Sequence, residues 1–270
     1  MPGPGAGWTK PPIAGPDGDR DHVAMTTISP PLGRRLAAEA VGTAALAAVV
    51  VGSGVRAAAL TEDGGVRFLA NVGASAIALT VLIRLLGPVS GGHFNPLVTA
   101  GAWWAGRRGG DGPGLRELGA YAAAQTAGAV VGTGLANVMF ERPFAEPSGR
   151  ARDGGALWLG EVVATGTLLL VVSGLARGRR GALVPASVGL WVGAACWATS
   201  SGGFGNPAVT VGRALTDSYT GIAAGSVPGF VLAQAAGAAG GVALAGLLFG
   251  RSDRTAVVPE DARDLVPGPR

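Results

Sequence analysis

The decapeptide SGGHFNPLVT at residues 90–99 returns, little changed, as SGGFGNPAVT at residues 201–210. Both copies contain Asn followed by Pro and a small or apolar residue, namely Asn95, Pro96 and Leu97, and Asn206, Pro207 and Ala208. Asn is a good helix N-cap, and Pro fits the first helical turn, so each copy predicts a helix that begins directly after its Asn. A doubled loop of this kind indicates two related halves.

Composition indicates a membrane protein. Of the 270 residues, 48% are hydrophobic and 14% are charged, which is about half the usual charged share of a soluble protein. The 48 glycines are typical of packed membrane helices, whose backbones approach closely at small residues. The single cysteine, Cys196, excludes a disulfide within the chain. The net charge of +4 lies outside the apolar segments, which indicates topology rather than nucleic-acid binding.

Six apolar stretches approach the roughly 20 residues that a membrane-spanning helix needs. They lie at about 36–55, 68–86, 116–139, 157–176, 182–199 and 226–249. Two shorter stretches, about 95–105 and 206–216, follow the Asn-Pro motifs and are too short to span. We therefore expect an all-α membrane protein of six transmembrane helices and two re-entrant half-helices.

The predicted channel-forming region is residues 35–250, divided into repeat one at about 35–140 and repeat two at about 156–250. Residues 1–34 are rich in Pro, Gly and Asp and predict a disordered cytoplasmic tail. Residues 251–270 predict a second cytoplasmic tail. Either Met1 or Met25 fits as the start of the chain.

Arginine placement predicts the orientation. Three loops or ends carry an excess of arginine, at Arg107, Arg108 and Arg116, at Arg177, Arg179 and Arg180, and at Arg251 and Arg254. The alternate loops balance arginine against acidic residues. Since cytoplasmic loops carry the excess of positive charge, we expect both termini in the cytoplasm and the chain in the inner (plasma) membrane. Three spans per half then invert the second half, so the two Asn-Pro loops enter from opposite faces.

The repeat extends into the helices. Glu39 in the first span matches Glu161 in the fourth, and Gln125 in the third matches Gln234 in the sixth. An inverted repeat places its functional site near the midplane, between the halves. Buried acids are costly unless paired, so two interpretations stand for the glutamates. They act as a proton relay in coupled transport, or they accept N–H groups from the re-entrant loops.

Two half-helices that meet by their N-termini determine what the interior can pass. Each N-terminus carries roughly half a positive charge and free N–H donors, so the pair disfavours a cation at the centre. The amides of Asn95 and Asn206 add donors that a neutral solute can accept. We expect a passive path for small uncharged solutes, with no catalytic residues, no cofactor and no metal site.

With these motifs the chain resembles the major intrinsic proteins, the family of aquaporins and aquaglyceroporins, over about residues 35–250. The resemblance is carried by Ser90–Thr99 and by the Glu-x-x-x-Thr pattern of the first and fourth spans. It implies a right-handed bundle of six helices and two half-helices, one pore per subunit, and a homotetramer in the lipid bilayer. It also implies that the buried polar residues support the loops, namely Glu39, Glu161, His93, Gln125 and Gln234.

The pore constriction departs from the family pattern. Members usually carry Arg three residues after the second Asn, where this chain has Val209. Counting from the motifs gives Ser75, Ala194 and Gly203 as the other filter positions. The chain has no His in the fifth span either, so the resemblance implies a wider and less charged filter. Glycerol, urea and arsenous acid, As(OH)3, are then candidate solutes besides water.

Arg213 lies one turn beyond Val209 on nearly the same helical face. Helical side chains lean toward the N-terminus, so its guanidinium is a candidate for the filter or the vestibule. The alternative is an i,i+4 pair with Asp217. The Asn-Pro-Ala-Val-Thr stretch followed by Arg213 is similar to a bacterial subgroup associated with arsenic-resistance genes.

Three other functions remain open at this point. The first is a water-selective aquaporin of the same fold. The second is an ion-coupled transporter with an inverted repeat, which would use Glu39 or Glu161 and need an ion gradient. The third is a non-conducting membrane protein with a collapsed pore, which Leu97 and the missing Arg permit. No nucleophile–base set or phosphate-binding loop in the sequence points to an enzyme.

Overall fold

The computed structural model describes residues 30–107, 112–178 and 180–250. Within those ranges every regular element is a helix. The elements are α1 (Leu32–Leu60), α2 (Gly64–Ser90), α3 (Pro96–Gly106), α4 (Leu115–Met139), α5 (Gly155–Arg177), the short 3-10 turn η1 (Gly181–Leu183), α6 (Val184–Ala198), α7 (Pro207–Arg213), a second 3-10 turn η2 (Ala224–Ser226) and α8 (Val227–Phe249).

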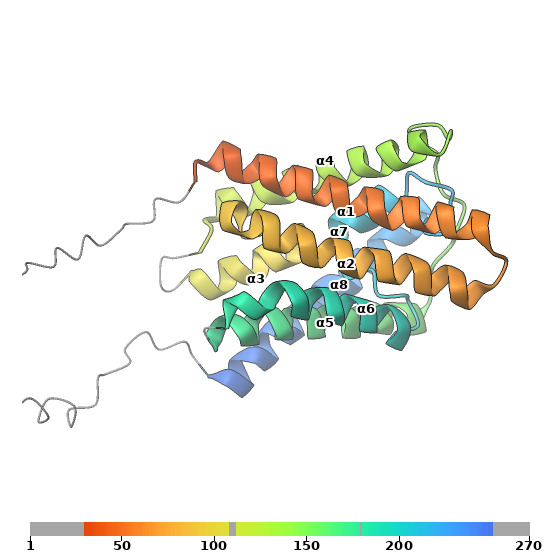
Figure 1. Ribbon diagram of the computed structural model, residues 1–270. Helices are drawn as coiled ribbons and strands as arrows, with labels where there is room; N and C mark the ends of the chain where they lie inside the picture. The colour runs from red at the N-terminus through yellow and green to blue at the C-terminus, as the bar shows by residue number, and fades with distance from the viewer. Residues whose placement is uncertain (1–29, 108–111, 179, 251–270) are drawn as a thin grey trace, which may run out of the picture.

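Six long helices lie side by side as a bundle, and the short α3 and α7 lie among them (Figure 1). By length and composition, α1, α2, α5, α6 with η1, and α8 with η2 are apolar enough to cross a membrane. The sixth long helix, α4, has 25 residues and packs along α1. The six expected spans and two half-helices are therefore all present, which confirms the predicted fold class.

The two halves of the bundle are built around matching helix pairs. α4 packs closely on α1, and α8 packs closely on α5. At both contacts a glycine replaces a side chain: a Cβ at Gly132 would lie 2.0 Å from the carbonyl oxygen of Ala44, and a Cβ at Gly241 would lie 2.0 Å from that of Gly166. Small residues at these crossings let the backbones touch, as is typical of helices packed in membranes.

Several helix ends differ from the sequence expectation; α1, for example, continues past residue 55 to Leu60. α7 was expected to reach residue 216 but ends at Arg213. The chain there tightens into a turn, with the N–H of Ala214 donating to the carbonyl of Val211 and that of Leu215 to Gly212. α2 continues through Pro88, beyond the expected end at 86, and ends at Ser90, followed by Gly91 in the left-handed conformation that favours glycine.

The first residues of α1 correct the predicted N-terminal tail. α1 begins at Leu32, so residues 32–34 are helical rather than part of the tail expected at 1–34. The rest of that tail up to residue 29, the choice between Met1 and Met25, and the C-terminal tail at 251–270 lie outside the described residues. α1 begins and α8 ends at the same end of the bundle, as six crossings require (Figure 1).

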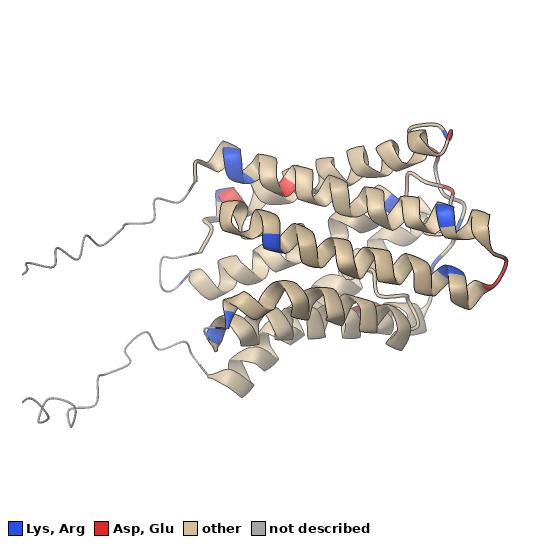
Figure 2. Ribbon diagram, viewed as in Figure 1, with Lys and Arg blue, Asp and Glu red and all other residues tan. Residues whose placement is uncertain are grey.

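Charge is arranged as in a protein that crosses a bilayer. Figure 2 shows most Lys, Arg, Asp and Glu residues at the two ends of the bundle, with a largely uncharged belt between them. Large apolar side chains on that belt are exposed; Ile77 is 68% exposed and Leu190 is 74% exposed. Such a surface is unfavourable in water and suited to lipid, so the described helices form an integral membrane protein.

Candidate functional site

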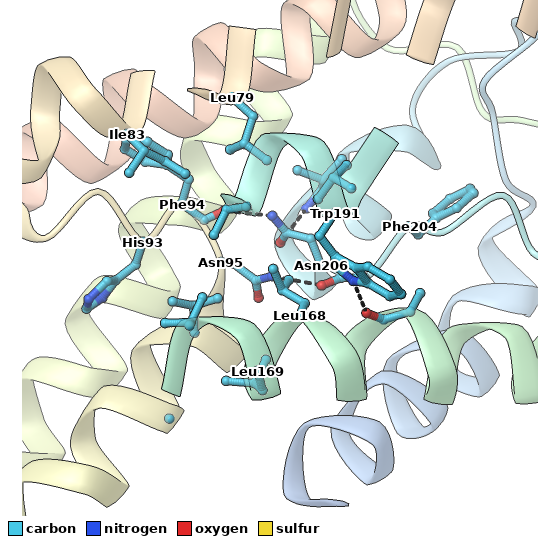
Figure 3. Close-up of a pocket in the computed structure, with 18 of the residues that line it drawn as sticks. Leu79, Ile83, His93, Phe94, Asn95, Leu168, Leu169, Trp191, Phe204 and Asn206 are labelled. Carbon is cyan, nitrogen blue, oxygen red and sulfur yellow. Dashed lines mark hydrogen bonds between the residues drawn. The ribbon is translucent and has the colours of Figure 1, made fainter. Parts of the chain in front are cut away.

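The two Asn-Pro loops meet inside the bundle and hold each other (Figure 3). The Asn95 side-chain oxygen accepts the N–H of Leu97 at 2.9 Å, and its Nδ2 donates to the carbonyl of Gly205 at 2.7 Å. Asn206 does the reverse: it caps α7, and its Nδ2 donates to the carbonyl of Phe94 at 2.7 Å. Each amide nitrogen carries two hydrogens. One hydrogen fixes the opposite loop, and the other is available to the cavity that both Asn residues line.

The buried carboxylate of Glu39 is surrounded by hydrogen-bond donors. It accepts the backbone N–H groups of His93 at 3.0 Å and Phe94 at 2.7 Å. It also accepts the hydroxyl of Ser90 at 2.6 Å and the amide of Gln125 at 2.7 Å. Four donors, from the last residue of α2, the first loop and α4, therefore share one carboxylate. The non-helical backbone of a re-entrant loop needs such partners, because lipid offers none.

Glu161 repeats this arrangement in the second half. It accepts the N–H groups of Phe204 and Gly205, both at 2.9 Å, and the amide of Gln234 at 2.6 Å. Gln234 also donates to the hydroxyl of Thr210 at 3.0 Å on α7. In the first half, Gln125 likewise donates to Thr99 on α3 at 3.0 Å. The inverted repeat seen in the sequence is thus also a repeat of hydrogen bonds.

His93 lies at the first loop with its ring close to α3. Its Nδ1 is 3.1 Å from the hydroxyl of Thr99, and its ring is tilted against that of Tyr121. Tyr121 donates its hydroxyl to the carbonyl of Ser90, which closes the loop against α4. His93 also lines the cavity, so this residue contacts both the first loop and the cavity.

A cavity of about 1730 Å³ extends along the bundle. Its wall includes Arg35 and Glu117 near the start of α1, passes Asn95 and Asn206, and reaches Arg152 at the opposite end. Apolar side chains line its middle (Figure 3), namely Leu79, Ile83, Leu168, Leu169 and Trp191. A wall that is apolar apart from a few fixed donors is typical of a small-molecule site.

Three of the four predicted filter residues line this cavity. Val209 is buried and lines the cavity close to Asn206. Gly203, on the loop before Asn206, lines it as well. Ser75 also lines the cavity, although its hydroxyl donates to the carbonyl of Asn71 one turn earlier at 2.7 Å. Ala194 is exposed and absent from the wall.

One filter position is therefore displaced by one residue. Ala195 lines the cavity in place of Ala194, and its backbone is where a Cβ at Gly203 would clash, at 3.0 Å. In the first motif Val98 lines the cavity and Leu97 does not, although both pack against the same apolar core. One helical residue turns a side chain by about 100°, so counting along a helix without its packing cannot fix which face meets the cavity.

Arg213 lines the cavity and does not pair with Asp217. Its Nε donates to the carbonyl of Thr220 at 2.5 Å, and its Cζ lies 3.3 Å from the ring centroid of Phe204. Asp217 instead accepts the N–H of Gly149 at 3.2 Å. Arg213 thus forms no i,i+4 pair with Asp217 and lies at the cavity wall, while its part in the filter or the vestibule stays a prediction.

Two wall residues near Arg213 were not identified from the sequence. Arg152, on the loop between α4 and α5, donates its Nε to the carbonyl of Gly221 at 2.9 Å. Burial, and then the charge of Arg150, lowers the pKa of the Arg152 guanidinium from its ordinary value. The other is Phe204, whose ring has Arg152 at 5.2 Å. Only Phe204 left a signal, because it takes the place of His93 in the repeated decapeptide.

Comparison with known proteins agrees with this architecture. The family signature "Major intrinsic protein" matches residues 26–200, which include the first Asn-Pro motif. The chain is 45% identical over 214 residues to "Aquaglyceroporin AqpS" of Rhizobium meliloti (strain 1021), covering 79% of this chain and 89% of that protein. It is 31% identical to "Aquaporin NIP1-1" of Zea mays, covering 74% of this chain and 71% of that protein.

A solved structure shares the fold. The aquaglyceroporin from Plasmodium falciparum superposes with a TM-score of 0.64 over 87% of this chain and 100% of that one, at 20% sequence identity. The fold likeness, the family signature and the identity to AqpS all lead to one assignment. The chain belongs to the major intrinsic protein family.

Proposed function

We propose that the chain is a passive channel for water and larger uncharged solutes such as glycerol. The observation that carries this proposal is the reciprocal pairing of Asn95 and Asn206 at the wall of a cavity that passes both of them. Their remaining amide hydrogens offer donors to a passing solute. The N-termini of α3 and α7 converge at the same place, so their positive ends oppose cations.

The side chains near Val209 favour solutes larger than water. Val209, Ser75, Ala195 and Gly203 are all small, and none carries a charge. A hydrogen-bonding solute such as glycerol passes more easily where small side chains leave room. AqpS is named an aquaglyceroporin, which supports the passage of solutes larger than water through this chain as well. Urea and As(OH)3 are uncharged solutes of similar size and belong to the same proposal.

The glutamates support loops rather than relay protons in this account. Glu39 and Glu161 are fully buried, and the oxygens of each carboxylate accept several donors. Neither glutamate is part of the cavity wall. His93, Gln125 and Gln234 have the same supporting role through Thr99 and Thr210. A channel of this kind needs no ion gradient, no cofactor and no chemical step.

The assembly and its placement are part of the proposal. We infer a homotetramer in the plasma (inner) membrane, with one pore in each subunit, as is typical of the family. Residues 35–250 form the channel, in two repeats of about 35–140 and 156–250, and both termini lie in the cytoplasm. A native mass of four 26.5 kDa chains for the purified protein would support the tetramer, and a conducting monomer would contradict it.

A water-selective pore is the second candidate, and one observation favours it. Arg213 and Phe204 stack on each other at the cavity wall, close enough to narrow the path beyond Val209. Stopped-flow light scattering on proteoliposomes distinguishes the two candidates. We expect water, glycerol and As(OH)3 to cross faster than in empty liposomes with no ion gradient. Acceleration of water alone would support the water-selective pore, and no acceleration of any solute would contradict both.

A further inference from the structure

The cavity wall is strongly cationic in the described part of the chain. It contains six arginines: Arg35, Arg107, Arg150, Arg152, Arg177 and Arg213. The one acidic residue in that wall is Glu117, which pairs with Arg35 near the start of α1. At the opposite end, which we call the α7 mouth, the wall holds Arg150, Arg152, Arg213, Phe204 and Tyr219. The described residues of this mouth include no carboxylate.

Two of these guanidinium groups share one aromatic ring. The Cζ atom of Arg213 lies 3.3 Å from the centroid of Phe204, and that of Arg152 lies 5.2 Å from it. The two charges are therefore separated by no more than about 8.5 Å, the sum of those distances. Like charges this close repel each other, and their repulsion is weakly screened where water is scarce.

Each of the two arginines uses only its Nε in a hydrogen bond to the described chain. Arg213 donates to the carbonyl of Thr220 and Arg152 to the carbonyl of Gly221. These two bonds fix the plane of each guanidinium. The terminal nitrogens bond to no described residue, and they are not sealed off from the cavity. They are therefore donors held in place without a partner.

The acidic side chains of the same region are engaged elsewhere. Glu161 is behind the loop, where it accepts N–H groups of residues 204 and 205. Asp153 accepts the hydroxyl of Ser226 at 2.8 Å, and Asp217 accepts the N–H of Gly149. Glu146 pairs with Arg142. None of these carboxylates lines the cavity, so the positive charge of the α7 mouth has no direct counter-ion there.

We propose that Arg152 and Arg213 form a binding site for a small oxyanion at the α7 mouth. A guanidinium presents its N–H groups as a planar fork that matches an oxyanion, and such charge-assisted bonds are the strong ones. A bound oxyanion also relieves the repulsion between the two partly buried cations. Because both arginines line the solute path, a bound anion slows the entry of neutral solutes. Only this effect on flux rests on the proposed function.

Sulfate is a suitable probe, because it is fully ionised at neutral pH and carries two charges for two guanidinium groups. We expect isothermal titration of the detergent-purified protein with sulfate, at constant ionic strength against chloride, to show saturable binding. Arg213→Gln and Arg152→Gln should each weaken that binding about tenfold, as expected for loss of one charge-assisted pair. If one variant does not fold, the other still shows whether sulfate binding depends on these arginines.

Arg67→Gln is the matched control. Arg67 lies at the start of α2, and a shallow groove is lined both by this part of α2 and by Arg152. Arg67 itself pairs with Glu62 and is absent from the cavity wall. Sulfate binding should be unchanged in this variant. Equal binding by the wild type, Arg213→Gln and Arg152→Gln would overturn the site, and so would the absence of saturable binding to a folded protein.

Flux separates this inference from the proposed function. In proteoliposomes, external sulfate at constant ionic strength should slow glycerol entry through the wild type and through Arg67→Gln, but not through Arg213→Gln. Normal glycerol entry that sulfate does not affect would overturn the placement of the bound anion on the solute path and leave the channel intact. Sulfate binding that depends on both arginines, in vesicles that pass no glycerol, would support the site and contradict the channel.

Discussion

At the scale of single residues, the buried carboxylates are surrounded by hydrogen-bond donors that depend on them as acceptors. Glu161 is fully buried and accepts two backbone N–H groups from the second loop and one side-chain amide from α8. A buried donor without an acceptor costs about 1–3 kcal/mol. The structural role of Glu161 therefore predicts a large loss of stability when its acceptor capacity is reduced.

We expect Glu161→Gln to lower the stability of the purified protein by about 2–4 kcal/mol, because an NH2 group would face at least one of the three donors. The apparent melting temperature in detergent measures the change. Glu62→Gln is the control, since the Glu62 side chain is 97% exposed and its ion pair with Arg67 is worth little. Wild-type flux that depends on a proton gradient, and loses that dependence in a Glu161→Gln protein of unchanged melting temperature, would favour the proton relay.

Val209 is the residue that separates this pore from the usual family filter. We expect Val209→Arg to narrow the cavity and to reduce glycerol flux about tenfold, which corresponds to about 1.4 kcal/mol of added barrier. Because water is smaller than glycerol, its flux should fall by less. Stopped-flow measurements of both solutes give the ratio, and Val209→Ala is the control that should retain glycerol flux. Equal loss of both fluxes, or no loss, would show that Val209 does not limit passage.

At the scale of helices, hydropathy and motifs were enough to predict the fold. Each of the eight expected helical segments is present, because membrane spans need long apolar stretches and half-helices need a cap followed by Pro. Helix faces were harder to predict. Ala194 was expected at the cavity and Ala195 lies there, because the rotation of α6 depends on its contact with Gly203.

Loop residues were the least predictable from sequence. Arg152 reaches the cavity from the loop between α4 and α5, guided by a hydrogen bond to the distant carbonyl of Gly221. Such a segment has no periodicity, so its sequence does not show which side chains turn inward. Phe204 could be located, because the repeat aligns it with His93, but the approach of Arg152 to its ring could not.

The contact between α5 and α8 gives a prediction for helix packing. We expect Gly241→Ala to separate the helices and to lower folded yield and melting temperature, because the new Cβ would lie 2.0 Å from the carbonyl oxygen of Gly166. Gly240→Ala is a matched control on the same helix, with no atom within 4 Å of its Cβ position. Equal behaviour of the two variants would contradict the close backbone contact.

At the scale of the whole molecule, charge predicts the orientation. The end of the bundle where α1 begins and α8 ends carries mainly arginine, including Arg34, Arg84 and Arg177, whereas acidic residues such as Glu62 and Asp63 accompany the arginines of the other end (Figure 2). By the positive-inside rule, we expect the first end to lie in the cytoplasm.

Fusions of alkaline phosphatase, which is active only outside the cytoplasm, measure this orientation. We expect a fusion after Gly250 to be inactive and a fusion after Gly149, in the loop between α4 and α5, to be active. The two fusions control each other for expression and for enzyme folding. The opposite pattern would invert the protein in the membrane and place the α7 mouth in the cytoplasm.

The central claim is that paired Asn-Pro half-helices form a path for neutral solutes that excludes protons. The most direct measurement follows glycerol entry by light scattering and internal pH by a trapped dye in the same proteoliposomes. The account predicts rapid glycerol entry without any ion gradient and a proton permeability equal to that of empty vesicles. Glycerol entry that requires a proton gradient, or protons that enter together with glycerol, would contradict it.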